Sequence, residues 1–220
     1  MYPKGNLLFP ASHGQLEAIL KEPAGSPSGA ALVCHPHPLG GGTMHNKVVF
    51  RAAAGLVDAG LTTIRFNFRG VGASTGTHVL HNEIEDGKQD VADAIGYLNS
   101  NFPGDDITLA GFSFGSRTGT DVGMSDDRVT RLISIGTPID KYGDYDFLTA
   151  LNKPILFVHG DRDDFGAVEN VRRLAAEVGK SANAELIVFD NCGHFFDDHL
   201  SQLRDVIHEW TVRQANILAH

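Results

Sequence analysis

The feature that most constrains the fold is a series of short apolar runs separated by segments with helical periodicity. Ala30–Cys34 is apolar throughout, which is typical of a strand buried on both faces of a sheet. Further strands, rich in apolar residues, are predicted at Leu61–Phe68, Ile107–Phe112, Leu132–Ile135, Ile155–His159 and Leu186–Phe189. Connections of about 10–20 residues between such strands favour parallel pairing with helices on both faces. The pattern therefore predicts an α/β protein with a mostly parallel sheet.

The remaining periodic segments complete this architecture. Leu7–Ala11 and Gln15–Lys21 flank a Ser-His-Gly turn and predict an N-terminal antiparallel hairpin. The predicted helices are Lys47–Ala59, Ile84–Leu98, Ser113–Val122, Ala167–Val178 and Leu200–Leu218. The one linker-like stretch, Glu22–Gly29, comes too early in the chain to separate two domains. We therefore expect a single domain over residues 1–220.

The charge and hydropathy of the chain argue against several classes of partner. With 27 acidic and 18 basic residues the net charge is −9, whereas proteins that bind nucleic acids or anionic membranes need a basic surface. The apolar runs are of strand length, far below the roughly 20 residues of a membrane span. Met1–Gly5 leads into no apolar signal segment. We expect a cytoplasmic protein, with Cys34 and Cys192 as free thiols.

A serine motif stands at the end of a predicted strand, where open parallel sheets bind their ligands. Gly111-Phe-Ser113-Phe-Gly115 joins the strand Ile107–Phe112 to a predicted helix. This is the G-x-S-x-G pattern of a nucleophile elbow, in which a tight turn exposes the serine hydroxyl. The N-terminus of the helix that follows stabilises a developing oxyanion. Ser113 is therefore the candidate nucleophile.

A serine hydroxyl needs a general base and a carboxylate that orients this base. His194 follows the last predicted strand and is the candidate base. Three aspartates follow the preceding strand: Asp161, Asp163 and Asp164. Asp161 is interpreted as a brace for its loop, and Asp164 as a solvated residue or a helix cap. Asp163 is the favoured partner of His194, with Asp161 as the alternative.

An oxyanion is held by two backbone N–H groups. The first belongs to Phe114, the residue after the nucleophile. The second comes from the loop that follows Ala30–Cys34, whose two prolines have no N–H to donate. The residues left as donors are His37, Leu39 and, less favourably, Gly40.

Two patterns in the same loop have weaker chemical interpretations. His35, His37 and His45 have no carboxylate or cysteine at a typical ligand spacing, so we expect hydrogen bonds that brace the loop and no metal. Gly40–Thr43 lacks the G-x-x-x-x-G-K-[ST] pattern, so we expect no bound nucleotide.

The segment that follows the second parallel strand carries charges and aromatic rings. For Arg69 we favour salt bridges that hold its loop over contact with an anionic substrate. Phe66 and Phe68 are predicted to be core or pocket wall. The acidic residues of the next helix are expected on a solvated face: Glu83, Glu85, Asp86 and Asp90.

Four motifs together resemble the small bacterial α/β-hydrolases that lack a lid. They are Val33-Cys-His35-Pro-His37-Pro-Leu39-Gly-Gly-Gly-Thr-Met, Arg65-Phe-Asn-Phe-Arg69-Gly-Val-Gly72-Ala-Ser74, Gly111-Phe-Ser113-Phe-Gly115 and Gly160-Asp-Arg-Asp163-Asp-Phe. The resemblance covers nearly the whole chain. It implies the α/β-hydrolase fold with the triad order Ser113, Asp163, His194. It also favours Leu39 as the second oxyanion donor. In the family the catalytic acid falls four residues after the histidine at the strand end, here His159, which favours Asp163 as the partner of His194.

The expected activity is that of a serine hydrolase cleaving a small ester or thioester through an acyl-enzyme, with no cofactor. The alternatives are a non-catalytic, receptor-like binding protein on the same fold and a peptidase of that fold. Only Gly136–Pro154 separates two predicted strands at the place where larger members insert a lid. This length is too short for a cap domain, so we expect Ser113 in a shallow, open cleft.

Overall fold

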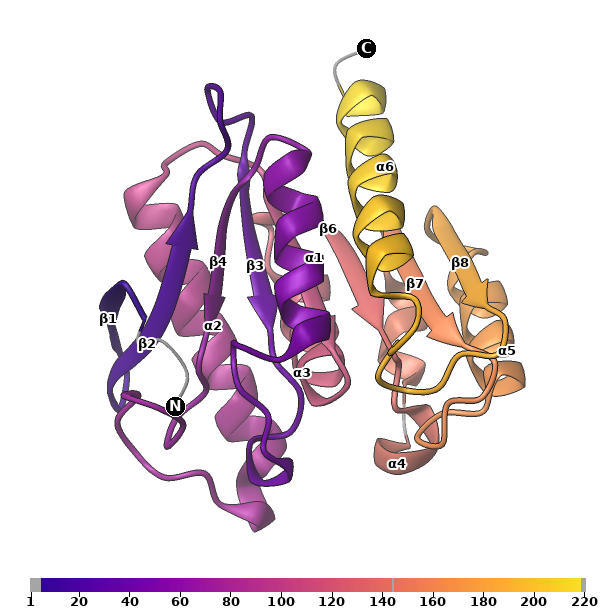
Figure 1. Ribbon diagram of the computed structural model, residues 1–220, viewed down its shortest axis with the longest axis horizontal. Helices are drawn as coiled ribbons and strands as arrows, with labels where there is room; N and C mark the ends of the chain where they lie inside the picture. Colours follow the sequence, from indigo (N-terminus) through magenta and orange to yellow (C-terminus); the bar gives the residue numbers. More distant parts are fainter. Residues whose placement is uncertain (1–4, 144, 219–220) are drawn as a thin grey trace.

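A single eight-stranded sheet forms the centre of the structure, a computed structural model that describes residues 5–143 and 145–218 (Figure 1). Met1–Lys4, on which the expectation of no signal segment partly rested, lies outside these ranges. The strands are β1 Leu7–Ala11, β2 Gly14–Lys21, β3 Ala30–Cys34, β4 Thr62–Phe66, β5 Ile107–Phe112, β6 Val129–Ile135, β7 Ile155–Gly160 and β8 Ala184–Phe189. The helices are α1 Lys47–Asp58, α2 Glu83–Asn101, α3 Phe114–Ser125, α4 Ile139–Tyr142, α5 Val168–Val178 and α6 Leu200–Leu218. Three short 3-10 helices are η1 Pro38–Gly40, η2 Leu80–Asn82 and η3 Asp146–Ala150.

The strand order is β1-β2-β4-β3-β5-β6-β7-β8. The hairpin strands β1 and β2 pair antiparallel, and β2 pairs antiparallel with β4. All other neighbours are parallel. The predicted mostly parallel sheet with an N-terminal antiparallel hairpin is therefore confirmed.

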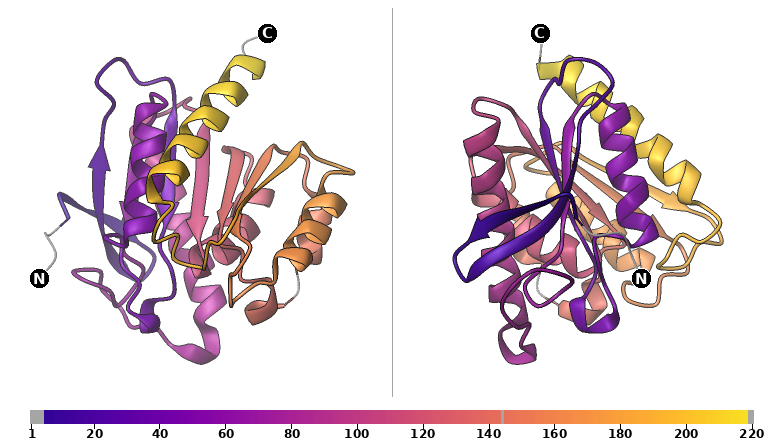
Figure 2. Two further views of the ribbon diagram at one scale, coloured as in Figure 1. Left: turned by 45° about the vertical axis from the view of Figure 1, so that its right-hand side comes forward. Right: turned by 60° about the vertical axis from the view of Figure 1, so that its left-hand side comes forward.

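Helices cover both faces of the sheet, as Figures 1 and 2 show. Along β7, Ile155 and Phe157 belong to the core beneath α2, α3 and α5, while Leu156 and Val158 belong to the core beneath α1 and α6. This alternation follows from the two-residue repeat of a strand. It explains why a strand such as β3 is apolar throughout its length, since each face buries every second side chain.

The connection between β6 and β7 contains only small elements. Its described residues form the one-turn helix α4 and the 3-10 helix η3. No cap domain occurs in residues 5–143 and 145–218, in agreement with the expectation of a lidless fold. Within the same residues, no helix has both the length and the hydropathy of a membrane span.

Several strands differ in length from their predictions. For example, β8 begins at Ala184, two residues early, and the differences in β4 and β6 have identifiable causes. β4 ends at Phe66, two residues early, because the Phe68 N–H donates to His35 Nε2 at 3.0 Å, a side-chain acceptor. β6 begins at Val129, three residues early. The earlier start includes Arg131, which is buried with its guanidinium 3.8 Å from Asp106. Because the buried Arg131 interrupts the apolar run, a search for apolar runs does not find the first part of β6.

The acidic residues of α2 are not all on a solvated face, so that expectation was wrong for Asp90. Its side chain is fully buried and accepts hydrogen bonds from Arg69 Nε at 2.9 Å and Nη2 at 2.7 Å. Arg69 also bonds Asp86 at 2.8 Å. The favoured interpretation of Arg69, a salt bridge that holds the β4–α2 loop, is thus confirmed. Phe66 and Phe68 are core residues, also as expected.

Candidate active site

Ser113 lies in the tight turn between β5 and α3. Its backbone has φ 54° and ψ −118°, a strained conformation for a residue with a side chain. Two glycines make the turn possible. A Cβ at Gly111 would lie 2.1 Å from the Gly115 carbonyl oxygen, and a Cβ at Gly115 would lie 2.4 Å from that of Cys34. The G-x-S-x-G spacing is therefore a steric requirement of this turn.

A continuous chain of hydrogen bonds joins Ser113, His194 and Asp163. Ser113 Oγ lies 2.9 Å from His194 Nε2, and His194 Nδ1 lies 2.7 Å from Asp163 Oδ2. The three residues are 7%, 6% and 7% exposed. An imidazole whose Nδ1–H donates to the carboxylate has its Nε2 lone pair free to accept the serine proton. The structure thus brings together three residues that follow three different strands.

The other two aspartates near β7 lie elsewhere. Asp161 Oδ1 accepts a hydrogen bond from the Cys192 N–H at 2.9 Å. This bond and others from nearby backbone lower the pKa of the Asp161 carboxyl. Asp164 is exposed and does not cap α5, whose N-cap is Ala167. Asp161 therefore ties the β7 loop to the loop that carries His194.

Several further residues surround the His194 imidazole and the Asp163 carboxylate. The sequence analysis did not predict these contacts. The rings of Phe112 and Phe165 lie 4.9 and 4.5 Å from that of His194, between ring centroids. Asp163 Oδ1 accepts the Phe165 N–H at 2.8 Å. His159 is buried 3.8 Å from Asp163 Oδ2, and its Nε2 donates to the Gly166 carbonyl at 2.7 Å. No local pattern predicts these contacts, because they depend on how the loops pack over the sheet edge.

Two backbone amides at helix starts are available as hydrogen-bond donors. Phe114 begins α3, and Leu39 lies in η1, after β3. Helix-initial N–H groups have no intrahelical acceptor, and among the described residues neither amide has another backbone acceptor. The Gly40 N–H, in contrast, donates to the His37 carbonyl at 3.1 Å. Leu39 is therefore a better candidate donor than Gly40.

His35 braces its loop, as expected. Its Nδ1 donates to the Pro36 carbonyl at 2.6 Å, and its Nε2 accepts the Phe68 N–H. Full burial lowers the pKa of His35 to about 3, so the ring stays neutral at neutral pH. Both cysteines are buried free thiols, as predicted.

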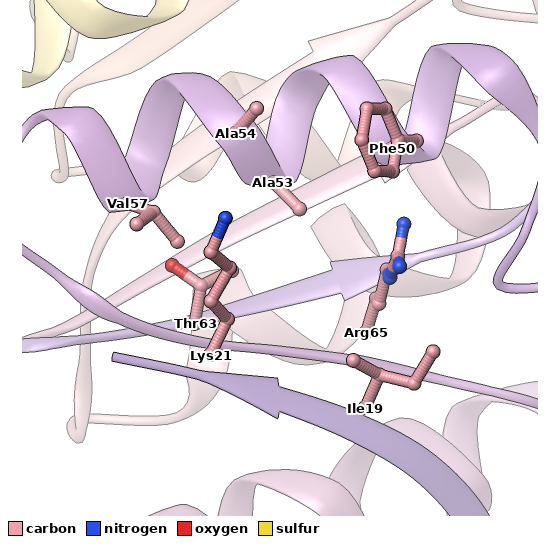
Figure 3. A pocket seen from close by; sticks show the side chains of 8 residues that line it. All are labelled: Ile19, Lys21, Phe50, Ala53, Ala54, Val57, Thr63 and Arg65. Carbon is pink, nitrogen blue, oxygen red and sulfur yellow. The ribbon is translucent and has the colours of Figure 1, made fainter. Parts of the chain in front are cut away.

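A small cavity of about 50 Å³ lies away from this site, between α1 and the strands β2 and β4 (Figure 3). Its walls are mostly apolar, and Arg65 lies over the Phe50 ring at 5.0 Å. None of its lining residues is a serine, a histidine or a carboxylate. The cavity therefore belongs to packing around Arg65 and contributes no group to the Ser113 site.

Comparisons with known proteins give one consistent result. Residues 30–215 match the family described as alpha/beta hydrolase domain. An uncharacterized protein of Rickettsia prowazekii is 30% identical over 97% of this chain and 92% of its own. An alpha-beta serine hydrolase homologue from Coxiella burnetii is 35% identical with a TM-score of 0.85, covering 95% of this chain and 99% of that one. A serine hydrolase without a lid from Xanthomonas campestris is 28% identical with a TM-score of 0.83, covering 97% and 96%.

Proposed function

This chain belongs to the alpha/beta hydrolase domain family, and we propose that it is a serine hydrolase that cleaves a small ester or thioester through an acyl-enzyme. The observation that carries the proposal is the hydrogen-bonded chain from Ser113 through His194 to Asp163. The strained turn at Ser113 supports it, because strain of this kind persists where the surrounding structure holds a reactive group in place.

The first half of the proposed reaction acylates Ser113. Its Oγ attacks the substrate carbonyl carbon while its proton passes to His194 Nε2. The amides of Phe114 and Leu39 donate hydrogen bonds to the oxyanion of the tetrahedral intermediate. The intermediate collapses, the bond to the alcohol or thiol breaks, and His194 Nε2–H protonates the leaving group.

The second half releases the acid. His194 Nε2 takes a proton from water, and the hydroxide attacks the acyl carbonyl. The bond to Ser113 Oγ then breaks, and His194 returns the proton to that oxygen. Throughout, Asp163 accepts the Nδ1–H bond, which holds the tautomer and stabilises the imidazolium.

The surroundings of the site favour short acyl groups. Leu39 and Phe195 are large apolar residues that are 58% and 47% exposed. The centroid of the Phe195 ring lies 5.3 Å from that of the His194 ring. Without a cap domain, such side chains contact the first carbons of an acyl chain but do not enclose a long one. The open cleft expected over Ser113 stays a prediction.

We expect kcat/KM to be highest for short p-nitrophenyl esters and not to rise continuously toward palmitoyl. Each buried CH2 would add about 0.8 kcal/mol to binding, but an open cleft leaves the distal carbons in water. The measurement is kcat/KM across a series from acetyl to palmitoyl, with matched thioesters. A continuous rise toward long chains, or a jump in rate above the micellar concentration, would show that the site is covered. Turnover of none of these substrates would count against the proposed activity itself.

A further inference from the structure

Beside the proposed nucleophile, two histidines and a glutamate meet in a way that the mechanism does not use. His37 follows β3, His78 lies in the β4–α2 loop, and Glu83 is the first residue of α2. Each offers one ligand atom, and the three atoms lie within 4.8 Å of one another. The spacing of 41 and 5 residues resembles no short metal motif, which is why the sequence pattern predicted only loop bracing.

The hydrogen bonding of this cluster is incomplete. His37 Nε2 lies 2.8 Å from Glu83 Oε2, and this pair alone would be an ordinary loop brace. His78, however, is a buried residue, 8% exposed, and neither of its ring nitrogens has a hydrogen-bond partner within the described residues. Burying an imidazole without a hydrogen-bond partner for either nitrogen costs free energy unless a bound ligand or ion contacts one of these nitrogens.

The cluster has one rigid wall and one open side. The Phe114 ring lies edge-on to both imidazoles, 5.3 Å from that of His37 and 5.7 Å from that of His78. The His37 and His78 rings are themselves 5.4 Å apart. The side chains of His37 and Glu83 are 15% and 17% exposed, so an ion can reach them from solvent. A hydrophobic shell around a metal site controls solvent access to it, and the Phe114 ring supplies one side of such a shell here.

From these contacts we propose that His37, His78 and Glu83 form a binding site for Zn²⁺. Two imidazoles and one carboxylate are a known ligand set for this ion, with water at the fourth position. Ligand atoms on one tetrahedral Zn²⁺ lie about 3.4 Å apart, given bonds of about 2.1 Å. Binding would therefore separate His37 Nε2 and Glu83 Oε2, now 2.8 Å apart, and close any pair in the cluster that lies near the 4.8 Å limit. Two nitrogen donors select Zn²⁺ over Mg²⁺ and Ca²⁺, which prefer oxygen.

A second group of potential ligands differs in its carboxylates, although both ring nitrogens of its histidine, His13, also lack a hydrogen-bond partner among the described residues. His13, Asp90 and Asp93 also lie within reach of one ion. Both oxygens of Asp90 already accept hydrogen bonds from Arg69, and Asp93 Oδ2 accepts two from Ser12. Those carboxylates are committed to protein donors. In the His37 cluster, Glu83 has only His37 as a partner among the described residues.

Zinc binding is tested directly, without reference to hydrolysis. Untagged, dialysed protein is titrated with Zn²⁺ in competition with a chromophoric chelator, and Co²⁺ is used to record the visible absorption of a tetrahedral site. We expect one Zn²⁺ per chain and no competition by Mg²⁺ or Ca²⁺. His78→Ala and Glu83→Gln should each weaken binding by on the order of 100-fold, since even outer-shell partners change affinity about 10- to 100-fold.

The matched control is His81→Ala, which removes an exposed histidine from the same segment and should bind like the unmodified protein. Glu83→Gln keeps the size of the side chain. If it lowers the affinity for Zn²⁺ while the thermal midpoint stays unchanged, the lost group is a zinc ligand and not a structural contact. Absence of stoichiometric binding, or equal affinities of the His78 and His81 variants, would overturn the proposal. The titration is repeated on Ser113→Ala, which should bind Zn²⁺ like the unmodified protein. Because binding is measured without hydrolysis, a failure of the zinc site would leave the proposed hydrolase function standing.

Discussion

Replacement of Ser113 by alanine is expected to lower kcat for a short p-nitrophenyl ester by on the order of 10⁴-fold or more. Without Oγ, the Nε2 lone pair of His194 has no nucleophile to activate, and the covalent route is lost. The side chain is small and its hydroxyl bonds only His194 among the described residues, so the fold should be kept. Steady-state kinetics and a thermal midpoint measure the two effects separately.

The control for this variant lies at the other end of the same helix. Ser125→Ala removes an exposed hydroxyl that, within the described residues, bonds only the Val122 carbonyl, and it should leave kcat unchanged. If Ser113→Ala retained even half of the activity, the hydrolysis would have to arise from another group. The acyl-enzyme mechanism would then be abandoned.

Asp163→Asn is expected to leave a folded protein with kcat reduced by on the order of 10⁴-fold. An amide at this position can present its NH₂ group to His194 Nδ1, which favours the tautomer whose Nε2 carries the proton and cannot accept one from Ser113. The substitution acts through the 2.7 Å contact between His194 Nδ1 and Asp163 Oδ2. The measurement is kcat at saturating substrate, with circular dichroism to verify folding.

Asp161→Asn is the matched variant, two residues away. Asp161 bonds the Cys192 N–H and does not contact the imidazole, so its loss should lower the thermal midpoint and leave kcat nearly unchanged. A reversed pair of results, with Asp161→Asn inactive and Asp163→Asn merely less stable, would assign the orienting role to Asp161.

The mostly parallel sheet and the position of the Ser113 group could be predicted because both depend on local patterns, whereas the strand order came only from the structure. Buried parallel strands are apolar runs, and side chains placed directly after them must meet at one edge of the sheet. Ser113, Asp163 and His194 each follow such a run. Their convergence therefore needs no knowledge of long-range packing.

Other features depend on contacts between distant segments and have no local signal. Asp90 is buried because Arg69, on another element, neutralises it, although its position in α2 suggested a solvated face. His78, in the β4–α2 loop, contacts His37, which follows β3, although 41 residues separate them in the sequence. Neither the periodicity of a helix nor the composition of a loop contains that information.

Covalent labelling is the most direct test of whether Ser113 is an activated nucleophile. The folded protein is treated with a fluorophosphonate, and the modified residue is located by mass spectrometry of its peptides. We expect one adduct per chain, on Ser113, and its loss in His194→Ala, because a serine without its base does not react at a useful rate. A folded protein that takes up no label, or that carries the label on another residue while Ser113 stays free, would contradict this expectation.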